Sequence, residues 1–407
     1  MKKISLILSI VVLATMRCFS QAEPDSVLYP VNFVANADTM EMDSDTTALV
    51  VDLSIPDSIY MKRLAVLPYK FKLTYNPIVK RYIELYTVKI KDKLEVILGL
   101  SNFYFPIFDE VLSSYQLPNE LKYITIIESA LNPCAVSRCR AVGLWQFMKG
   151  TGKENGLQIN NYIDQRRGFI ESTRAAAKYL SNLYETYHDW QLVLAAYNCG
   201  PGNVNKAIRR SGGKRDFWEV YRFLPRETRG YVPEYIGAVY AFNYYKEHNI
   251  SPVAATYPLQ TDTITIAKPL HFGQVSEVLG IPMDELRRIN PQYLKDMVPG
   301  SGRKVYSLRV TLEQKSKFVA LQDSIYSYRD LYYKNEFLKL NKAPKRPAFI
   351  TSSVAGKTLH QVQSGESIWI IAGQYNVSVA KIKSWNNISG NKIKPGQRLI
   401  VQTASGT

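Results

Sequence analysis

The chain has 407 residues, which is too long for one ordinary domain and indicates two or three folded units. Hydrophobic residues make up 46% of it, which is enough to build real cores and argues against a chain without folded structure. The formal net charge of +16 suits nucleic acid, an anionic membrane surface or another anionic polymer. No nucleic-acid-binding motif accompanies the charge, so we expect no nucleic-acid partner.

The first twenty residues predict export. Residues 1–3 are basic, residues 4–14 form an apolar run, and small or polar residues follow. This pattern is typical of a secretory signal peptide over residues 1–20, with an uncleaved anchor as the alternative. Cys18 would offer a lipid anchor in the outer membrane, but Arg17 stands where lipoprotein signals have a small residue. We therefore expect a periplasmic or cell-envelope protein and leave membrane association open.

A helical domain is predicted next. Residues 21–62 are acidic, lack periodicity and are predicted to be a flexible lead-in. Residues 63–250 carry apolar side chains at helical spacing and few strand patterns. The predicted helices span residues 77–100, 118–131, 169–187, 190–197 and 231–247.

The C-terminal part contains two copies of a small module. A constant offset of 96 carries Ile266 onto Val362, Ile281 onto Val377, Leu286 onto Ile382, Asn290 onto Asn386, and Pro299-Gly300 onto Pro395-Gly396. Each copy reads as strand, two short helices and strand. We expect modules at 260–311 and 357–403, separated by a linker with a charged helix at 312–356. The predicted fold is multidomain: a mainly α domain followed by small α+β (βααβ) modules.

Glu128 is the candidate catalytic residue. Leu121, Ile124 and Glu128 fall on one stripe of the predicted helix, so the carboxyl faces the apolar side. Desolvation raises the pKa of such a carboxyl, as a general acid acting near neutral pH requires. The alternative is an ordinary glutamate at a helix end whose partner satisfies it.

Several motifs surround Glu128 in the sequence. They are Glu128-Ser129, Asn132-Pro133, Ser137, Gly143-Leu144-Trp145-Gln146-Phe147-Met148, Ala196-Tyr197-Asn198-Cys199-Gly200-Pro201-Gly202, Pro225-Arg226-Glu227-Thr228 and Tyr231-Val232-Pro233. In this order and at these separations they resemble the lytic transglycosylases with a goose-type lysozyme fold. The branch they are most similar to is the membrane-bound murein transglycosylase D type, which carries C-terminal LysM modules.

The resemblance implies roles for six residues. Glu128 would be the acid that becomes the base, and Tyr231 would orient it. Ser137 and Gln146 would bind substrate, while Tyr197 and Asn198 would position the N-acetylmuramoyl (MurNAc) unit.

The resemblance also implies an activity. The enzyme would cleave the β-1,4 bond between MurNAc and N-acetylglucosamine (GlcNAc) in peptidoglycan strands and leave 1,6-anhydromuramoyl ends. This chemistry needs one carboxylate, no water and no cofactor. Ordinary glycosidases use two carboxylates, and Glu227 is the nearest second candidate in the motifs.

Cysteines and histidines give further expectations. Cys134 and Cys139 are close enough in sequence to form a loop disulfide in an oxidising compartment, with two free thiols as the alternative. Cys199 would remain unpaired. The four histidines show no ligand spacing, so we expect no metal site.

The second module resembles a LysM domain. By that resemblance a groove would bind GlcNAc-containing chains. One side of the groove would have Ser364, Gly365, Glu366 and Ser367, and the other side would have Asn387 and Ile388. Trp369 and Trp385 suit either the core or the groove. The first copy lacks the Ser-Gly-Glu turn and has Leu270-His271-Phe272 there, so it either binds glycan or only packs on the catalytic domain.

Three rival functions remain open at this stage. The protein could be a muramidase that uses water, or an inactive wall-binding scaffold, or a basic nucleic-acid binder supported by charge alone. The sequence indicates no oligomeric state.

Overall fold

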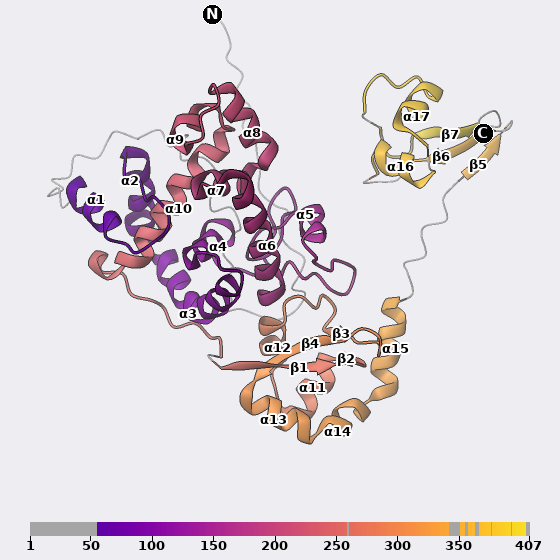
Figure 1. Ribbon diagram of the computed structural model, residues 1–407. Helices are drawn as coiled ribbons and strands as arrows, with labels where there is room; N and C mark the ends of the chain where they lie inside the picture. The colour runs from indigo at the N-terminus through magenta and orange to yellow at the C-terminus, as the bar shows by residue number, and fades with distance from the viewer. Residues whose placement is uncertain are drawn as a thin grey trace, which may run out of the picture. The chain divides into compact units, whose positions relative to one another are not determined.

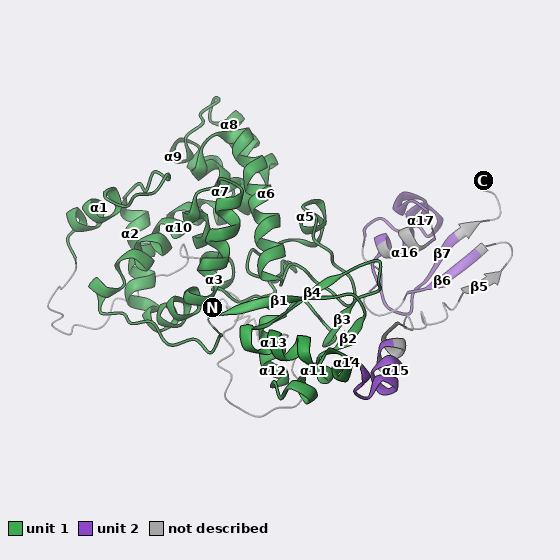
Figure 2. Cartoon of the chain, turned by 60° about the horizontal axis from the view of Figure 1, so that its bottom comes forward, with its two compact units in different colours: residues 1–326 green, residues 327–407 purple. Residues whose placement is uncertain are grey.

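The computed structural model describes residues 55–258, 260–341, 351–354, 357–362, 366–375, 377–391 and 393–403. The chain forms two compact units that divide between Tyr326 and Ser327 (Figures 1 and 2). The predicted signal peptide and most of the predicted lead-in lie outside the described residues.

The first domain is helical, as predicted. Its α-helices are α1 (Asp57–Ala65), α2 (Pro77–Glu84), α3 (Lys91–Ser114), α4 (Ile124–Ser129), α5 (Lys149–Glu154), α6 (Phe169–Tyr187), α7 (Trp190–Cys199), α8 (Pro201–Arg210), α9 (Phe217–Val220) and α10 (Arg226–Tyr244). Short turns of other helix types occupy Leu85–Lys89, Asn119–Tyr123, Tyr221–Phe223 and Lys246–His248.

Helix boundaries follow local chemistry. Asn76 caps α2 by accepting hydrogen bonds from two backbone amides, and Asp189 caps α7 in the same way through the amide of Leu192. The prediction for α6 is confirmed over its whole length. The helix predicted over 77–100 is instead interrupted by a π turn at Leu85–Lys89.

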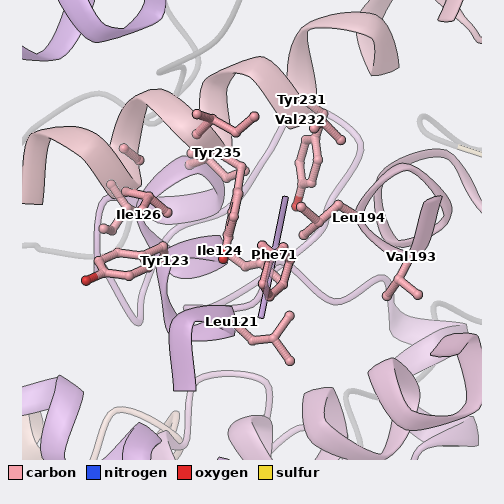
Figure 3. Packing of buried hydrophobic residues seen from close by; sticks show 14 of the residues in the cluster. Phe71, Leu121, Tyr123, Ile124, Ile126, Val193, Leu194, Tyr231, Val232 and Tyr235 are labelled. Atoms are coloured by element: carbon pink, nitrogen blue, oxygen red, sulfur yellow. The ribbon is translucent and has the colours of Figure 1, made fainter. Parts of the chain in front are cut away.

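Helix α10 lies at the centre of the first core. Every side chain from Tyr231 to Ala241 is buried. At Gly237 a Cβ would lie 2.8 Å from the Cβ of Tyr82, so the small residue lets α10 approach α2 closely. Figure 3 shows Tyr231, Val232 and Tyr235 projecting from α10 among residues such as Ile124. These contacts place α10 against the helix that carries Glu128.

Two features of this domain differ from the expectation. Tyr60 and Leu64 of α1 are buried in its core, so the domain begins before residue 63 and the lead-in boundary at 62 is wrong. Helix α3 runs to Ser114, beyond the predicted helix end at residue 100, and it is long and apolar enough to cross a membrane by length and composition. Phe103, Tyr104 and Phe108 of α3 pack in the core, which accounts for its apolar sequence.

The second domain contains the first module. It comprises β1 (Thr261–Ile266), β2 (Pro269–His271), α11 (Phe272–Leu279), α12 (Met283–Ile289), β3 (Met297–Pro299), β4 (Tyr306–Thr311), α13 (Leu312–Ala320) and α14 (Gln322–Ser327). Strand β1 pairs antiparallel with β4, and β2 with β3. Phe318 of α13 and Ile325 of α14 are buried in the same core. The predicted module end at 311 is therefore wrong, because these helices complete its core.

The last module has one more strand than predicted. It contains β5 (Thr351–Val354), β6 (Lys357–Gln361), α16 (Ile368–Gln374), α17 (Val379–Trp385) and β7 (Arg398–Thr403), and α15 (Asp330–Asn341) precedes it. The sheet order is β5-β6-β7, so β5 extends the sheet from within the predicted linker.

The internal repeat is visible in its hydrogen bonds. Asn386 donates to the carbonyls of Ile382 and Ile400 and accepts from the Ile400 amide. Asn290 makes the same three bonds with Leu286 and Arg309. The offset between the asparagines is 96 (386 − 290), but between their strand partners it is 91 (400 − 309). The first copy thus has five extra residues before its last strand.

The first module packs directly on the helical domain. Ile163 belongs to the helical domain in sequence, yet it is buried in the core of the module. The Asp164 amide donates to the Gln292 carbonyl at 2.9 Å, and the Leu294 amide to the Tyr162 carbonyl at 2.8 Å. These contacts show that the first copy packs on the helical domain, while glycan binding by this copy stays a prediction.

The shared core predicts an effect of Ile163→Ala. The substitution leaves a cavity in the second core, so we expect the free energy of unfolding to fall by about 2 to 4 kcal/mol in urea titrations. Ile59→Ala is the matched control, because Ile59 is 39% exposed and its truncation should change stability by about 0.5 kcal/mol or less. Equal effects of the two substitutions would contradict the role assigned to Ile163.

Candidate active site

Glu128 stands in the last turn of α4, where the chain reverses. Ala130 and Leu131 both adopt left-handed backbone angles, with φ of +51° and +61°, and end the helix. The Ser129 hydroxyl donates to the Leu144 carbonyl at 2.9 Å. The end of α4 is therefore tied to the segment that carries Gln146.

The environment of Glu128 favours its protonated form. The side chain is half-buried, and burial of the carboxyl raises its pKa from 4.5 to about 7. The Tyr231 hydroxyl donates to Oε1 of Glu128 at 2.6 Å, and this bond opposes the rise because it stabilises the carboxylate. Near neutral pH the group can therefore both give and take a proton.

A glycine turn holds Gln146 close to the end of α4. Gly143 has a φ of +89°, and a Cβ there would overlap the carbonyl oxygen of Arg166. The Gln146 side-chain amide donates to the carbonyls of Gly143 at 2.8 Å and Ala135 at 3.3 Å. Gln146 thus supports the turn from within.

Arg166 supports the same turn and was not predicted. Its guanidinium pairs with Asp164 at 2.7 Å and donates to the carbonyls of Arg140 and Phe147, both at 3.2 Å. Both charged side chains are buried. Asp164 and Arg166 follow Ile163 in the same loop. The loop that supports the turn at Gly143 is therefore also anchored in the core of the second domain.

Tyr197 and Asn198 lie at the end of α7. The Tyr197 hydroxyl donates to the Trp145 carbonyl at 2.7 Å. Burial, and to a smaller extent the charge of Glu128, raise the pKa of Tyr197 well above its usual value. The side chain of Asn198 is exposed and accepts a hydrogen bond from the Thr228 hydroxyl at 2.8 Å. Thr228 was not predicted as a site residue, although it stands in the quoted Pro-Arg-Glu-Thr motif.

Ser137 shapes the loop before the glycine turn. Its hydroxyl accepts from the Ala141 amide at 3.0 Å, and its own amide donates to the Ala141 carbonyl. The Ser137 side chain therefore closes this turn. A role in substrate binding stays a prediction.

The predicted disulfide does not form in the structure. Cys134 and Cys139 are both exposed, and no bond joins them. The Cys134 sulfur lies 4.0 Å from an Arg167 nitrogen, and backbone hydrogen bonds between Ser137 and Arg140 already close the intervening loop. Both cysteines are therefore thiols in the structure, which was the alternative to the disulfide.

A second carboxyl lies near Glu128, and it is not the predicted Glu227. Glu227 is exposed in the first turn of α10. Glu234, three residues after Tyr231, is 2% exposed and accepts from the Tyr86 hydroxyl at 3.3 Å. Burial, and to a smaller extent the charge of Glu128, raise the pKa of Glu234 well above its usual value. Burial therefore disfavours the ionised form of the Glu234 carboxyl.

The predicted LysM residues are only partly described. Ser364 and Gly365 lie outside the described residues, whereas Glu366 and Ser367 lie within them. The Glu366 carboxylate contacts the buried His360 ring at 2.8 Å.

The other side of the expected groove is more open. Asn387 is exposed, whereas Ile388 packs partly against the module core. Trp369 is 56% exposed and Trp385 is half-buried, so Trp369 is the tryptophan available to a ligand. Throughout the described ranges, no group of three or more His, Cys, Asp and Glu side chains could hold a metal ion.

Three family models match the chain. Residues 106–219 match the transglycosylase SLT domain, residues 260–327 the LysM-like domain of the lytic transglycosylase MltD, and residues 360–402 the LysM domain. The chain therefore combines an SLT transglycosylase domain with two LysM-type domains. The second match extends beyond residue 311, in agreement with the core that Phe318 and Ile325 complete.

Among individual proteins, the chain is similar to the membrane-bound lytic murein transglycosylase D of Escherichia coli K12. The two are 28% identical over 293 residues, which cover 71% of this chain and 61% of the relative. The chain thus spans about three fifths of that relative's length. The N-acetylmuramoyl-L-alanine amidase sle1 of Staphylococcus saprophyticus is 52% identical over 50 residues, 12% of this chain and 15% of that one.

Solved structures give a shorter match. The 70-kDa soluble lytic transglycosylase of Escherichia coli is 28% identical and covers 35% of this chain and 24% of its own, with a TM-score of 0.31. The lytic transglycosylase Slt of Pseudomonas aeruginosa, solved as an inactive mutant, is 25% identical and covers 37% and 25%, with a TM-score of 0.30.

The raised pKa of Glu128 predicts that Glu128→Gln stabilises the fold at alkaline pH. Below about pH 4.5 the Glu128 carboxyl is protonated in both the folded and the unfolded state, so the wild type and the variant should have similar free energies of unfolding. As pH rises to about 7 the unfolded state loses this proton more readily, so the wild type loses stability. We expect the Gln variant to unfold with a free energy about 1 to 3 kcal/mol higher at pH 8. Urea titrations at pH 4 and pH 8 measure this, and a gap independent of pH would contradict the pKa.

Proposed function

We propose that this protein is a peptidoglycan lytic transglycosylase that cleaves the MurNAc–GlcNAc β-1,4 bond and forms 1,6-anhydromuramoyl ends. The observation that carries the proposal is the carboxyl of Glu128, with a pKa raised to about 7 and a hydrogen bond from Tyr231, within an SLT transglycosylase domain. The substrate is the glycan strand of the cell wall, and the site of action is the cell envelope. The proposed export follows from the N-terminal pattern, and it fits the similarity to the membrane-bound transglycosylase of E. coli.

The reaction has two proton transfers at one group. Protonated Glu128 gives its proton to the glycosidic oxygen as the bond to C1 breaks. The ionised carboxylate, stabilised by the Tyr231 hydroxyl, then takes the proton of the C6 hydroxyl of the same muramoyl unit as that oxygen bonds to C1. Glu128 ends protonated and no water is consumed.

Glu234 favours this reaction over the hydrolysis that a muramidase performs. A glycosidase with two carboxylates needs the second one ionised, as nucleophile or as base toward water. Glu234 is a buried carboxyl near Glu128, and burial raises its pKa well above the usual value, which disfavours the ionised form that either role needs.

The LysM domain would hold the enzyme on its substrate. Residues Ser364 to Ser367, Asn387 and Ile388 are proposed to contact GlcNAc-containing chains, with Trp369 beside them because of its exposure. Ser137, Gln146, Tyr197 and Asn198 are proposed to bind the strand at the catalytic domain. The first module acts as a structural support through Ile163.

Product analysis tests the proposed function. Purified peptidoglycan is digested with the wild type and with Glu128→Gln, and the products are identified by mass spectrometry. We expect anhydromuramoyl ends from the wild type and none from the variant, because an amide cannot donate the proton. Reducing ends from the wild type would make the protein a muramidase, and no products from either would favour a wall-binding scaffold.

Tyr231→Phe should change both rate and pH profile. Loss of the hydroxyl removes a stabilising bond to the carboxylate, so we expect kcat to fall by about tenfold or more. Activity needs protonated Glu128 and falls as pH rises through about 7; the midpoint should move upward in the variant, since the lost bond lowered the pKa.

Tyr235→Phe is the matched control for this experiment. Tyr235 is also buried on α10, but its hydroxyl donates to the Glu120 carbonyl instead. Its removal should leave the midpoint of the pH profile in place. A midpoint that moves equally in both variants would refute the assignment of Tyr231.

A further inference from the structure

A cationic cavity lies beside the proposed active site. It has a volume of about 370 Å³ and is formed where α8 meets the 221–223 turn and the first turn of α10. Five of its nine lining residues are cationic and none is acidic: Lys206, Arg210, Arg222, Arg226 and Arg229. The mechanism proposed above uses none of them.

The cavity has a fixed wall. Arg229 donates through Nε to the Leu224 carbonyl at 3.1 Å and through Nη2 to the Arg222 carbonyl at 2.8 Å. These bonds fix the turn on which Arg222 stands, while Lys206 and Arg210 are exposed on α8. Cations of one sign gathered in a concave surface repel one another and raise the local concentration of anions.

The cavity is built on the same elements as the active site. Asn203, which lines it, donates to the Cys199 carbonyl at 2.8 Å, one residue after Asn198. Asn198 in turn accepts from Thr228, and Arg226 and Arg229 flank Thr228 on α10. A ligand in the cavity therefore lies next to the residues proposed to position the muramoyl unit.

We propose that this cavity binds the free carboxylates of a stem peptide on the glycan strand. The inference rests on the proposed function, because it names the part of that substrate which the cavity takes. In peptidoglycan the lactyl carboxyl of MurNAc is joined to the peptide, so free carboxylates lie on the peptide itself. Arginine guanidinium groups match carboxylates with two parallel hydrogen bonds.

The test compares two substrates and two adjacent arginines. Glycan strands with stem peptides, and strands stripped of them by an amidase, are digested by the full chain while anhydromuramoyl ends are counted. The variants are Arg210→Gln, which removes a lining cation, and Arg209→Gln, which removes an exposed cation of α8 outside the cavity. Wild type should have a higher kcat/KM on peptide-bearing strands.

We expect Arg210→Gln to reduce the preference for peptide-bearing strands by about threefold to tenfold, because one partly exposed charge contact is lost. Arg209→Gln should keep this preference. An unchanged preference in Arg210→Gln, or an equal loss in both variants, would overturn the proposal.

Binding measurements separate this proposal from the proposed function. Calorimetry with the soluble tripeptide L-alanyl-D-glutamyl-diaminopimelate needs no cleavage. Weaker binding in Arg210→Gln than in Arg209→Gln supports the cavity even if no anhydromuramoyl ends form. Inorganic phosphate that binds the wild type and loses affinity in Arg210→Gln, with no binding of the tripeptide, would overturn the stem-peptide assignment in favour of a phosphate site.

Discussion

The hydrogen bond from Tyr231 to Glu128 is the contact on which the site depends. It joins α10, the helix at the centre of the core, to the end of α4. Burial raises the pKa of the carboxyl and this bond limits the rise, so the same oxygen atoms can lose and regain a proton near neutrality. A shift of α10 relative to α4 would change both effects together, and the close approach of α10 to α2 at Gly237 is one of the contacts that hold α10 in place.

The helices and the site motifs could be predicted from sequence because their signals are local. Apolar periodicity predicted α6 and α7, and the spacing of the motifs pointed to Glu128 and Tyr231. Arg166 and Glu234 carry no such signal, because their importance comes from residues distant in sequence, such as Phe147 and Tyr86. The chain around them had to be folded before they could be recognised.

The predicted boundaries of the modules were wrong for the same reason. The repeat of 96 residues located the strands and helices that both copies share, and Asn290 and Asn386 make equivalent bonds. Phe318 and Ile325 belong to the first copy alone, so a comparison between copies could not include them. Strand β5 was assigned to a linker because its four residues show no turn or periodicity signal of their own.

Ile163 has a consequence for how such chains can evolve. Here a residue of the catalytic domain completes the core of the first module, and the adjacent Asp164 and Arg166 hold the turn of Gln146. Recombination at the boundary between these two domains would leave a hydrophobic side chain in water and loosen the turn that holds Gln146, so we expect the two domains to be inherited as one piece.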